Sequence, residues 1–439
     1  MKLLKRVCSK QLIYLKDRMD KIVINGGKPL NGEVFISGAK NAVLPIMTAC
    51  VIEPGKYTLN NVPDLRDTRT MGRLIEMIGG SVQFHNNSMQ INTINCDKPV
   101  APYELVKTMR ASFYVLGPFM SRYNYAEVSL PGGCAWGPRP VDFHLKALEA
   151  MGATISLERG NLISKGELHG AEIDFEKVSV GATGNTLMAA LKANGKTIIN
   201  NAACEPDITD LVDFLSKLGG DIKGRDTTQL TIQGMPELNG GFEYDIIPDR
   251  IEAGTFLIGV ALTGGEVTLR NVNPEHLGVV ISKLKEVGTD IQSDDNSITI
   301  RSSKKINPVD MTTAAYPGFP TDLQAQWMAL MCLASGDSTI IDDIYHDRFT
   351  HMAELSRFGA NLHLVDNVAS VKGIEKFYGA PVMSTDIRAS ASLILAALAA
   401  DGKSEISRIY HIDRGYENIE LKLQGLGADI KRTKAKETL

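Results

Sequence analysis

The segment LPGGCAWGPRPVD places a cysteine and an arginine where glycine and proline prevent regular structure. Six of the ten residues from Pro131 to Pro140 are glycine or proline, which predicts a loop rather than a helix or a central strand. Neighbouring cations such as Arg139 and Lys40 would favour the thiolate of Cys134, which could then act as an acid or a nucleophile. The residue type also allows a second interpretation, a small buried cysteine.

Polar or charged groups recur at the starts of six apolar segments that are expected to be helices. They are Lys40 and Asn41; Arg110; Gly181, Thr183 and Asn185; Asp249, Arg250 and Glu252; Asp322; and Asp386 with Arg388. Asp and Thr fit ordinary helix caps, whereas Lys and Arg oppose the helix dipole, so an anionic ligand would explain them. Asp322 in Pro-Thr-Asp fits a plain N-cap as well as a general base. Asp386 could cap its helix while it orients Arg388.

The elements that carry these residues repeat at intervals of about 70 residues. In each copy an amphipathic helix ends at a glycine, which serves as a C-cap, and a strand follows. A second helix in each copy is apolar nearly all round and should therefore be buried. Each copy predicts a β-α-β-α-β-β module. The six terminating glycines are Gly79, Gly152, Gly219, Gly288, Gly359 and Gly427.

Length and composition predict two globular domains, because 439 residues exceed the roughly 250–300 at which single cores stop growing. With 44% hydrophobic residues and a net charge of −4, nothing suggests nucleic acid as a partner, and no apolar run reaches the roughly 18 residues that span a membrane. The six cysteines and eight histidines lack ligand spacing, which predicts neither zinc nor disulfides and fits the cytosol. Residues 1–18 are basic and do not form a signal peptide, so they are expected to be an extension before Met19.

Six longer motifs are spread over these modules: SGAKNAVLP, KTMRAS, LPGGCAWGPRPVD, PTDLQAQ, TDIRASASL and HIDRGYENIE. Together with the repeats they resemble the UDP-N-acetylglucosamine 1-carboxyvinyltransferases over residues 19 to about 433. These enzymes move the enolpyruvyl group of phosphoenolpyruvate onto UDP-N-acetylglucosamine (UDP-GlcNAc) and so commit it to peptidoglycan. The resemblance implies a two-domain inside-out α/β barrel with three modules in each domain. The N-termini of its buried helices would face the cleft between the domains.

The resemblance also implies boundaries and catalytic roles. The first domain would cover 39–247, and the second would join 19–38 to 248–439. Cys134 would be the general acid that protonates C3 of phosphoenolpyruvate, and the thiol that the epoxide fosfomycin alkylates. Asp322 would take the proton of the sugar 3′-hydroxyl as that oxygen attacks C2. Lys40, Arg139 and Arg414 complete the implied catalytic set.

Two groups of binding residues follow from the same resemblance. Phosphoenolpyruvate would contact Lys40, Asn41, Arg139, Arg348, Arg388 and Arg414. UDP-GlcNAc would contact Asn41, Arg110, Arg139, Pro140, Val141, Asp142, Phe143, Lys177, Ser179, Val180, Gly181, Asp322 and Ile344. By its type alone, Arg348 also fits a surface salt bridge.

No metal or organic cofactor is expected, and the enzyme should be cytoplasmic. Two alternatives compete with the transferase. One is a catalytically degenerate relative that binds UDP-GlcNAc and acts in regulation. The other is the sister enzyme that acts on shikimate 3-phosphate, which lacks the cysteine loop and the RPVD segment.

Overall fold

The computed structural model describes residues 20–130, 141–303 and 305–434, apart from the side chain of Arg110. Its contacts divide the chain into two compact units. The continuous unit consists of Ser37–Asp249, and the discontinuous unit joins the described residues up to Ile36 with those from Arg250 onward. Cys134, Arg139 and Pro140 lie outside the described residues, as does the expected basic extension.

The chain passes from one unit to the other between Ile36 and Ser37 and again between Asp249 and Arg250. The backbone N–H of Asp249 donates to the carbonyl oxygen of Ser37 at 2.8 Å, and Gly38 forms a β-bridge with Pro248. These contacts hold both crossing segments together within the continuous unit.

The continuous unit contains three modules. Its elements are α2 (Lys40–Ala49), β3 (Lys56–Asn60), α3 (Arg66–Met77), β4 (Ser81–His85), β5 (Ser88–Asn92), β6 (Val100–Ala101), α4 (Tyr103–Val106), the 3₁₀ helix η1 (Arg110–Val115), α5 (Leu116–Tyr123), β7 (Tyr125–Ser129), α6 (Asp142–Ala150), β8 (Thr154–Glu158), β9 (Asn161–Lys165), β10 (Glu172–Asp174), α7 (Val180–Ala190), β11 (Lys196–Asn200), α8 (Pro206–Lys217), β12 (Asp221–Lys223), β13 (Gln229–Gln233) and β14 (Glu243–Asp245).

The discontinuous unit contains the other three. Its elements are β1 (Asp20–Asn25), β2 (Leu30–Phe35), α9 (Arg250–Thr263), β15 (Gly265–Arg270), η2 (Pro274–Leu277), α10 (Gly278–Val287), β16 (Asp290–Asp294), β17 (Ser297–Ser302), β18 (Met311–Thr313), η3 (Thr321–Leu323), α11 (Gln324–Met331), β19 (Ser338–Asp342), α12 (His351–Arg357), β20 (Asn361–Val365), β21 (Val368–Lys372), β22 (Pro381–Met383), α13 (Ile387–Ala399), β23 (Lys403–Ser407), η4 (Ile409–Arg414), α14 (Ile419–Gly425) and β24 (Asp429–Lys434).

Within the described residues the strands form six four-stranded sheets. Each sheet pairs two strands in parallel and adds two antiparallel strands, as in the order β10-β11-β13-β12. This arrangement confirms the predicted β-α-β-α-β-β modules. Three sheets borrow a strand from a distant part of the chain: β14 pairs with β3, β2 pairs with β15, and β1 lies between β23 and β24.

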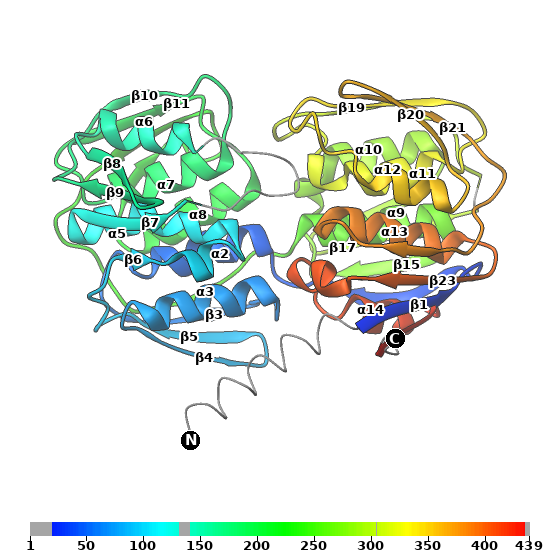
Figure 1. Ribbon diagram of the computed structural model, residues 1–439, viewed down its shortest axis with the longest axis horizontal. Helices are drawn as coiled ribbons and strands as arrows, with labels where there is room; N and C mark the ends of the chain where they lie inside the picture. Colours follow the sequence, from blue (N-terminus) through cyan, green and yellow to red (C-terminus); the bar gives the residue numbers. More distant parts are fainter. Residues whose placement is uncertain (1–19, 131–140, 304, 435–439) are drawn as a thin grey trace. The chain divides into compact units, whose positions relative to one another are not determined.

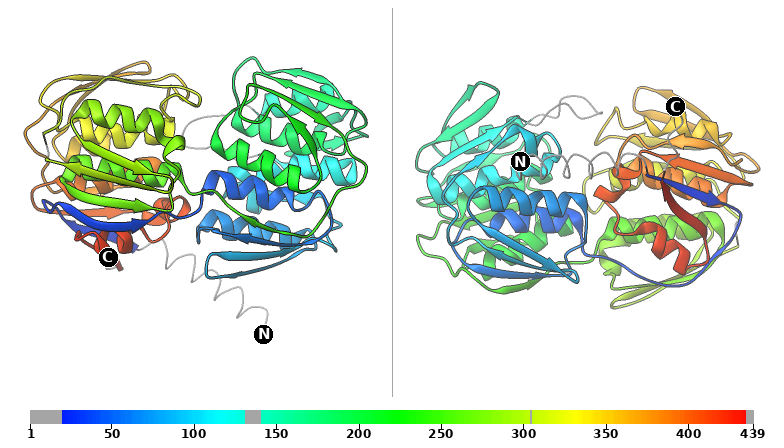
Figure 2. Two further views of the ribbon diagram at one scale, coloured as in Figure 1. Left: turned by 180° about the vertical axis from the view of Figure 1, so that it is seen from behind. Right: turned by 60° about the horizontal axis from the view of Figure 1, so that its bottom comes forward.

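Three apolar helices form the interior of each unit, with the sheets outside them (Figures 1 and 2). They are α2, α5 and α7 in one unit and α9, α11 and α13 in the other, as the apolar patterns predict. Glycines allow these helices to approach closely. A Cβ atom at Gly117 of α5 would lie 2.3 Å from the backbone oxygen of Asn185 in α7, so the packing there leaves no room for a side chain.

The amphipathic helices end as the sequence predicts. The glycine that follows or ends each of them has a φ angle between 93° and 110°, a left-handed conformation that residues with a Cβ atom rarely adopt. The six glycines are Gly79, Gly152, Gly219, Gly288, Gly359 and Gly427.

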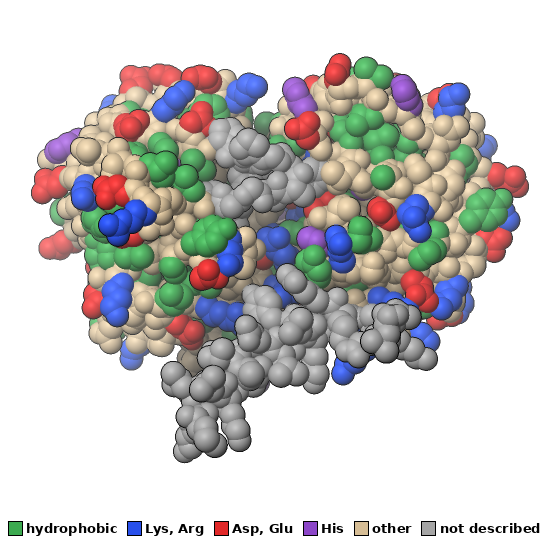
Figure 3. Space-filling view, in the orientation of Figure 1, with side chains coloured by type: hydrophobic (Ala, Val, Ile, Leu, Met, Phe, Trp, Pro, Cys, Tyr) green, Lys and Arg blue, Asp and Glu red, His purple; other side chains and the backbone are tan. Residues whose placement is uncertain are grey.

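The buried helices of the second and fifth modules differ from the prediction because each begins with a 3₁₀ turn, η1 or η3. In the second module Pro118 lacks the N–H that a continuous α-helix would bond to the carbonyl of Tyr114, so the α-helix starts afresh at Leu116. For η3 the sequence offers no comparable reason. No helix in the described part of the chain is long and apolar enough to cross a membrane. On the face in Figure 3, basic and acidic side chains are interspersed over each unit.

Candidate active site

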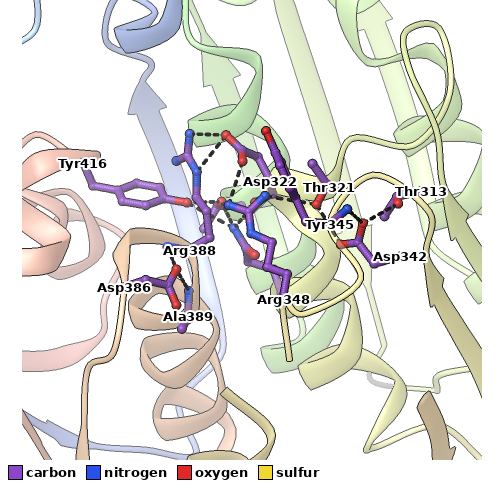
Figure 4. A network of polar contacts seen from close by, with 12 residues as sticks. Thr313, Thr321, Asp322, Asp342, Tyr345, Arg348, Asp386, Arg388, Ala389 and Tyr416 are labelled. Atoms are coloured by element: carbon purple, nitrogen blue, oxygen red, sulfur yellow. Dashed lines mark hydrogen bonds and ion pairs between the residues drawn. The ribbon is translucent and has the colours of Figure 1, made fainter. Parts of the chain in front are cut away.

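Asp322 lies between two arginines in the discontinuous unit (Figure 4). Its Oδ1 atom is 2.8 Å from Nη2 of Arg348, and its Oδ2 atom accepts hydrogen bonds from Nη2 and Nε of Arg388 at 2.8 and 3.1 Å. Asp322 comes from η3, Arg348 from the turn before α12, and Arg388 from the first turn of α13. Three segments far apart in the sequence therefore meet at one carboxylate.

The charges in this cluster determine what Asp322 can do. Burial raises the pKa of Asp322, but the guanidinium groups of Arg388 and Arg348 outweigh it and hold that pKa well below its usual range. Asp322 is therefore ionised, yet it is a weak base while both of its oxygen atoms contact arginine. A role as general base requires at least one of these contacts to loosen.

Two interpretations from residue type alone are wrong. Asp322 forms no capping hydrogen bond at η3, because its oxygens are occupied by the two arginines. Arg348 is not part of a surface salt bridge, since its side chain is only 10% exposed and also donates from Nη1 to the hydroxyl of Thr321 at 3.0 Å.

Asp386 caps α13, as one interpretation of the sequence predicted. Its Oδ1 atom accepts from the backbone N–H groups of Arg388 and Ala389 at 2.9 and 3.0 Å. The guanidinium carbon of Arg388 lies 5.4 Å from the ring centre of Tyr416. Asp386 thus holds the backbone of Arg388, and the Tyr416 ring lies against its guanidinium group. The expected phosphoenolpyruvate residue Arg414 ends η4, which packs against α13.

In the continuous unit, Lys40 begins α2 and forms a buried ion pair. Its ammonium lies 3.0 Å from Oδ2 of Asp67, in the first turn of α3. Asn41 follows it and is half-buried. The unfavourable cations at the N-termini of α2 and α13 thus each have a carboxylate partner within their own unit. An anionic ligand is therefore not the only explanation for them.

Asp67→Ala is expected to destabilise the protein by about 3–5 kcal/mol, because it removes one partner of a buried ion pair. Urea unfolding at neutral pH would measure this loss. Asp64→Ala is the matched control, since Asp64 forms an exposed pair with Arg69 and should cost at most about 1 kcal/mol. Equal losses in the two variants would show that the burial of the Lys40–Asp67 pair has no energetic consequence.

The two segments expected to line the UDP moiety lie side by side in the continuous unit. Val141, Asp142 and Phe143 form the start of α6, while Lys177 is exposed and Ser179 caps α7 through its hydroxyl. Helices α6 and α7 pack together, and a Cβ atom at Gly181 would lie 3.1 Å from Nε2 of His144. The first turn of α7, with Val180 and Gly181, is thus next to the start of α6. Arg110 begins η1, which packs against α2 and α7.

Two other polar residues of α7, Thr183 and Asn185, have a structural role. Thr183 accepts from the backbone N–H of Ala203, and Asn185 accepts from Gly117 N–H while it donates to the carbonyl of Phe113. These backbone partners fix the orientation of the Asn185 amide, so its NH₂ group also donates to Nδ1 of His144 at 2.8 Å. Asn185 therefore joins α5, α6 and α7.

Sequence reasoning missed the residues that hold the Asp322 cluster in place. Gln326 donates to the backbone carbonyl of Asp322 and to the hydroxyl of Tyr416, both at 3.1 Å. Thr321 and Asp342 hold Arg348 and the turn that carries Ile344 (Figure 4). Ile344, expected to contact the amino sugar, is 40% exposed.

Comparison with known proteins identifies the family of this chain. The family model for EPSP synthase (3-phosphoshikimate 1-carboxyvinyltransferase) matches residues 24–423. The UDP-N-acetylglucosamine 1-carboxyvinyltransferase of Chlorobaculum parvum is 52% identical over 423 residues, covering 95% of this chain and all of the relative. The enzyme of the same name from Geotalea daltonii is 52% identical over 415 residues, 94% of this chain and 99% of its own.

Solved structures agree with these relatives. The enolpyruvyl transferase NikO from Streptomyces tendae has a TM-score of 0.85 at 25% identity over 95% of this chain and 99% of its own. EPSP synthase from Acinetobacter baumannii, 19% identical over 94% and 99% of the two chains, shares the fold with a TM-score of 0.72. The identity across nearly the whole chain, the six modules and the shared fold show that the protein belongs to the UDP-N-acetylglucosamine 1-carboxyvinyltransferases, within the EPSP synthase family.

Proposed function

We propose that this protein is a cytoplasmic enzyme that transfers the enolpyruvyl group of phosphoenolpyruvate to the 3′-hydroxyl of UDP-GlcNAc and releases phosphate. This reaction would be the first committed step of peptidoglycan synthesis. The observation that supports it best is the carboxylate of Asp322 held by Arg348 and Arg388, in a chain with these relatives. The same cluster offers a base for a hydroxyl group and cations for an anionic cosubstrate.

The proposed reaction has three steps. Cys134 donates a proton to C3 of phosphoenolpyruvate, which makes C2 electrophilic. The 3′-oxygen of the sugar then bonds to C2 while Asp322 accepts its proton. The tetrahedral intermediate loses phosphate from C2 and a proton from C3, which restores the double bond. Lys40, Arg139 and Arg414 stabilise the phosphate and carboxylate charges throughout.

Binding of phosphoenolpyruvate makes Asp322 more basic, because it draws the arginines away from the carboxylate. The phosphate and carboxylate of phosphoenolpyruvate compete with Asp322 for Arg348 and Arg388, because all three groups are anionic oxygen acceptors. When a guanidinium turns toward the cosubstrate, the pKa of Asp322 is no longer held so low, and the carboxylate becomes a better base.

Sugar-nucleotide contacts are assigned to two segments next to each other and to two single residues. One segment is Val141–Phe143, and the other comprises Lys177, Ser179, Val180 and Gly181. The single residues are Asn41 and Ile344. The adjacency of the starts of α6 and α7 supports the assignment. Asp322 also contacts the sugar as the proposed base, and Arg110, Arg139 and Pro140 are added on the resemblance alone.

The described cysteines make Cys134 easy to test. Burial raises the pKa of Cys96 to about 11 and that of Cys332 to about 12, and it also raises the pKa of Cys50 and Cys204. Since the thiolate is the reactive form, these four thiols should be slow toward an epoxide. A fosfomycin adduct should therefore form at Cys134 in preference to these four thiols.

The decisive experiment measures phosphate release from phosphoenolpyruvate, with and without UDP-GlcNAc and after treatment with fosfomycin. Release that needs both substrates, is abolished by fosfomycin and coincides with an adduct mapped to Cys134 by mass spectrometry would support the proposal. Cys134→Ser serves as the control for the adduct. Binding of UDP-GlcNAc without phosphate release would instead indicate the degenerate regulatory relative and contradict the proposal.

A further inference from the structure

Asp342, at the end of β19, is a fully buried carboxylate without a described cationic partner. It is 0% exposed. Its Oδ1 atom accepts from the hydroxyl of Thr313 at 2.8 Å and from the backbone N–H groups of Ile344 and Tyr345 at 3.1 and 2.8 Å. Its Oδ2 atom accepts from the hydroxyl of Thr321 at 2.7 Å. Four donors from the protein therefore surround this carboxylate in place of water.

The donors to Oδ1 hold the turn after β19. Both backbone N–H groups belong to the residues that lead from the strand toward Arg348, and Ile344 lies at the exposed part of this turn. A turn tied at two successive N–H groups has little freedom to change its backbone. Oδ1 therefore places the residue proposed to contact the amino sugar.

The donor to Oδ2 controls the direction of a second hydrogen bond. The hydroxyl of Thr321 has a single proton, which points to Oδ2 of Asp342. A guanidinium can only donate, so Nη1 of Arg348, 3.0 Å away, must use the lone pair of the same hydroxyl. Nη2 of that guanidinium then lies 2.8 Å from Oδ1 of Asp322. Figure 4 shows the resulting series Asp342, Thr321, Arg348 and Asp322.

We propose that Asp342 is a positioning residue that ties the contact for the amino sugar to the orientation of Arg348 on Asp322. The inference rests on the proposed function and extends it to a residue that does not touch substrate. One oxygen holds the Ile344 turn, and the other makes Thr321 accept from Arg348. Only a carboxylate meets both demands, because an amide would present an NH₂ group to one of the two sets of donors.

Asp342→Asn separates the two effects. The amide oxygen should remain on the side of Oδ1, where three donors meet, which leaves the NH₂ group facing Thr321. The hydroxyl proton of Thr321 must then point toward Nη1 of Arg348. Because Nη1 can only donate, the hydrogen bond between Thr321 and Arg348 is lost. We expect kcat to fall at least tenfold and the acid limb of the pH profile to move upward, with the KM for UDP-GlcNAc changed less than threefold.

Thr321→Val tests the same step without a change at Asp342, and it decides the matter if Asp342→Asn does not fold. It should reproduce the loss in kcat, whereas Thr321→Ser keeps the hydroxyl and should stay within threefold of the native kcat. Thr263→Val is the matched control in the same unit, because it removes another buried hydroxyl, bonded to a helix carbonyl. It should lower the melting temperature without a change in kcat or in the pH profile.

The outcomes separate the two proposals. Full activity in Thr321→Val, or an equal loss of kcat in Thr263→Val, would overturn the positioning role while the proposed function stands. If the native protein folds but releases no phosphate with both substrates, the proposed function fails, and the role of Asp342 fails with it.

Discussion

Asp322→Asn should lower kcat by about 10²–10⁴-fold, the usual contribution of a general base. The amide is nearly isosteric but cannot take the proton of the sugar 3′-hydroxyl. It also presents an NH₂ group to Arg348 or Arg388, which both only donate. Because the sugar nucleotide is held mainly by other residues, the KM for UDP-GlcNAc should change far less than kcat. Steady-state kinetics with both substrates varied would measure the two effects.

The control for this variant is Asp213→Asn. Asp213 also forms a two-point contact with an arginine, Arg225, at 2.7 and 2.8 Å, but on an exposed surface. Its loss should leave kcat unchanged within twofold. If Asp322→Asn kept more than a tenth of the native kcat, Asp322 would not be the base, and its two arginines would be the more important part of the cluster.

Arg388→Ala should have the second largest effect, on stability and on its pH dependence. The side chain of Arg388 is 4% exposed and that of Asp322 is 24% exposed, so the variant leaves a largely buried carboxylate with one arginine fewer. We expect a loss of about 3–5 kcal/mol at neutral pH, measured by urea unfolding. The KM for phosphoenolpyruvate should rise as well, because the variant loses one of its proposed cations.

The sign of the pH effect follows from the lowered pKa of Asp322 in the folded protein. A carboxylate with a lowered pKa adds stability above its unfolded pKa of about 3.9, and this stability is lost as the pH falls through the folded value. In Arg388→Ala the pKa of Asp322 is lowered less, so less stability should remain to be lost as the pH falls below about 5 toward the folded value. Identical pH dependence in the two proteins would contradict the assignment. Arg388→Lys keeps the charge but not the two-point contact, and should recover part of the stability.

Local patterns predicted the modules well because they depend on neighbouring residues. A glycine after an amphipathic helix predicts a C-cap in the left-handed conformation, and all six glycines adopt this conformation. The cap at Asp386 could be predicted for the same reason, since its partners are two and three residues away. The apolar stretch after Asp386 is likewise a buried helix, α13, as its composition indicates.

The charge cluster could not be predicted from such patterns. Asp322 meets Arg388 66 residues later in the chain, and the chemistry of a Pro-Thr-Asp sequence gives no sign of that contact. Residue type alone therefore gave a wrong cap for Asp322 and a wrong surface pair for Arg348. The resemblance to a family supplied the roles, and the structure supplied the contacts.

The repeats share a feature directly after the middle strand of the sheet. In the first, third and fourth modules the residue after this strand is an asparagine with φ between 53° and 55°, namely Asn61, Asn201 and Asn271. Each of these side chains donates to a backbone carbonyl. In the fifth module that position is Asp343, whereas Asp342 is the last residue of the strand itself. The repeats therefore gave no signal that singles out Asp342.

The borrowed strands have a consequence for synthesis on the ribosome. The continuous unit uses only residues 37–249 and can fold as soon as β14 has emerged. Strands β1 and β2 emerge first, but β1 must wait for β24, more than 400 residues later, before its second edge is paired. At about 5–20 residues per second, this delay is on the order of tens of seconds. During that time an open strand edge remains exposed, so the start of the chain should be the part that most needs a chaperone.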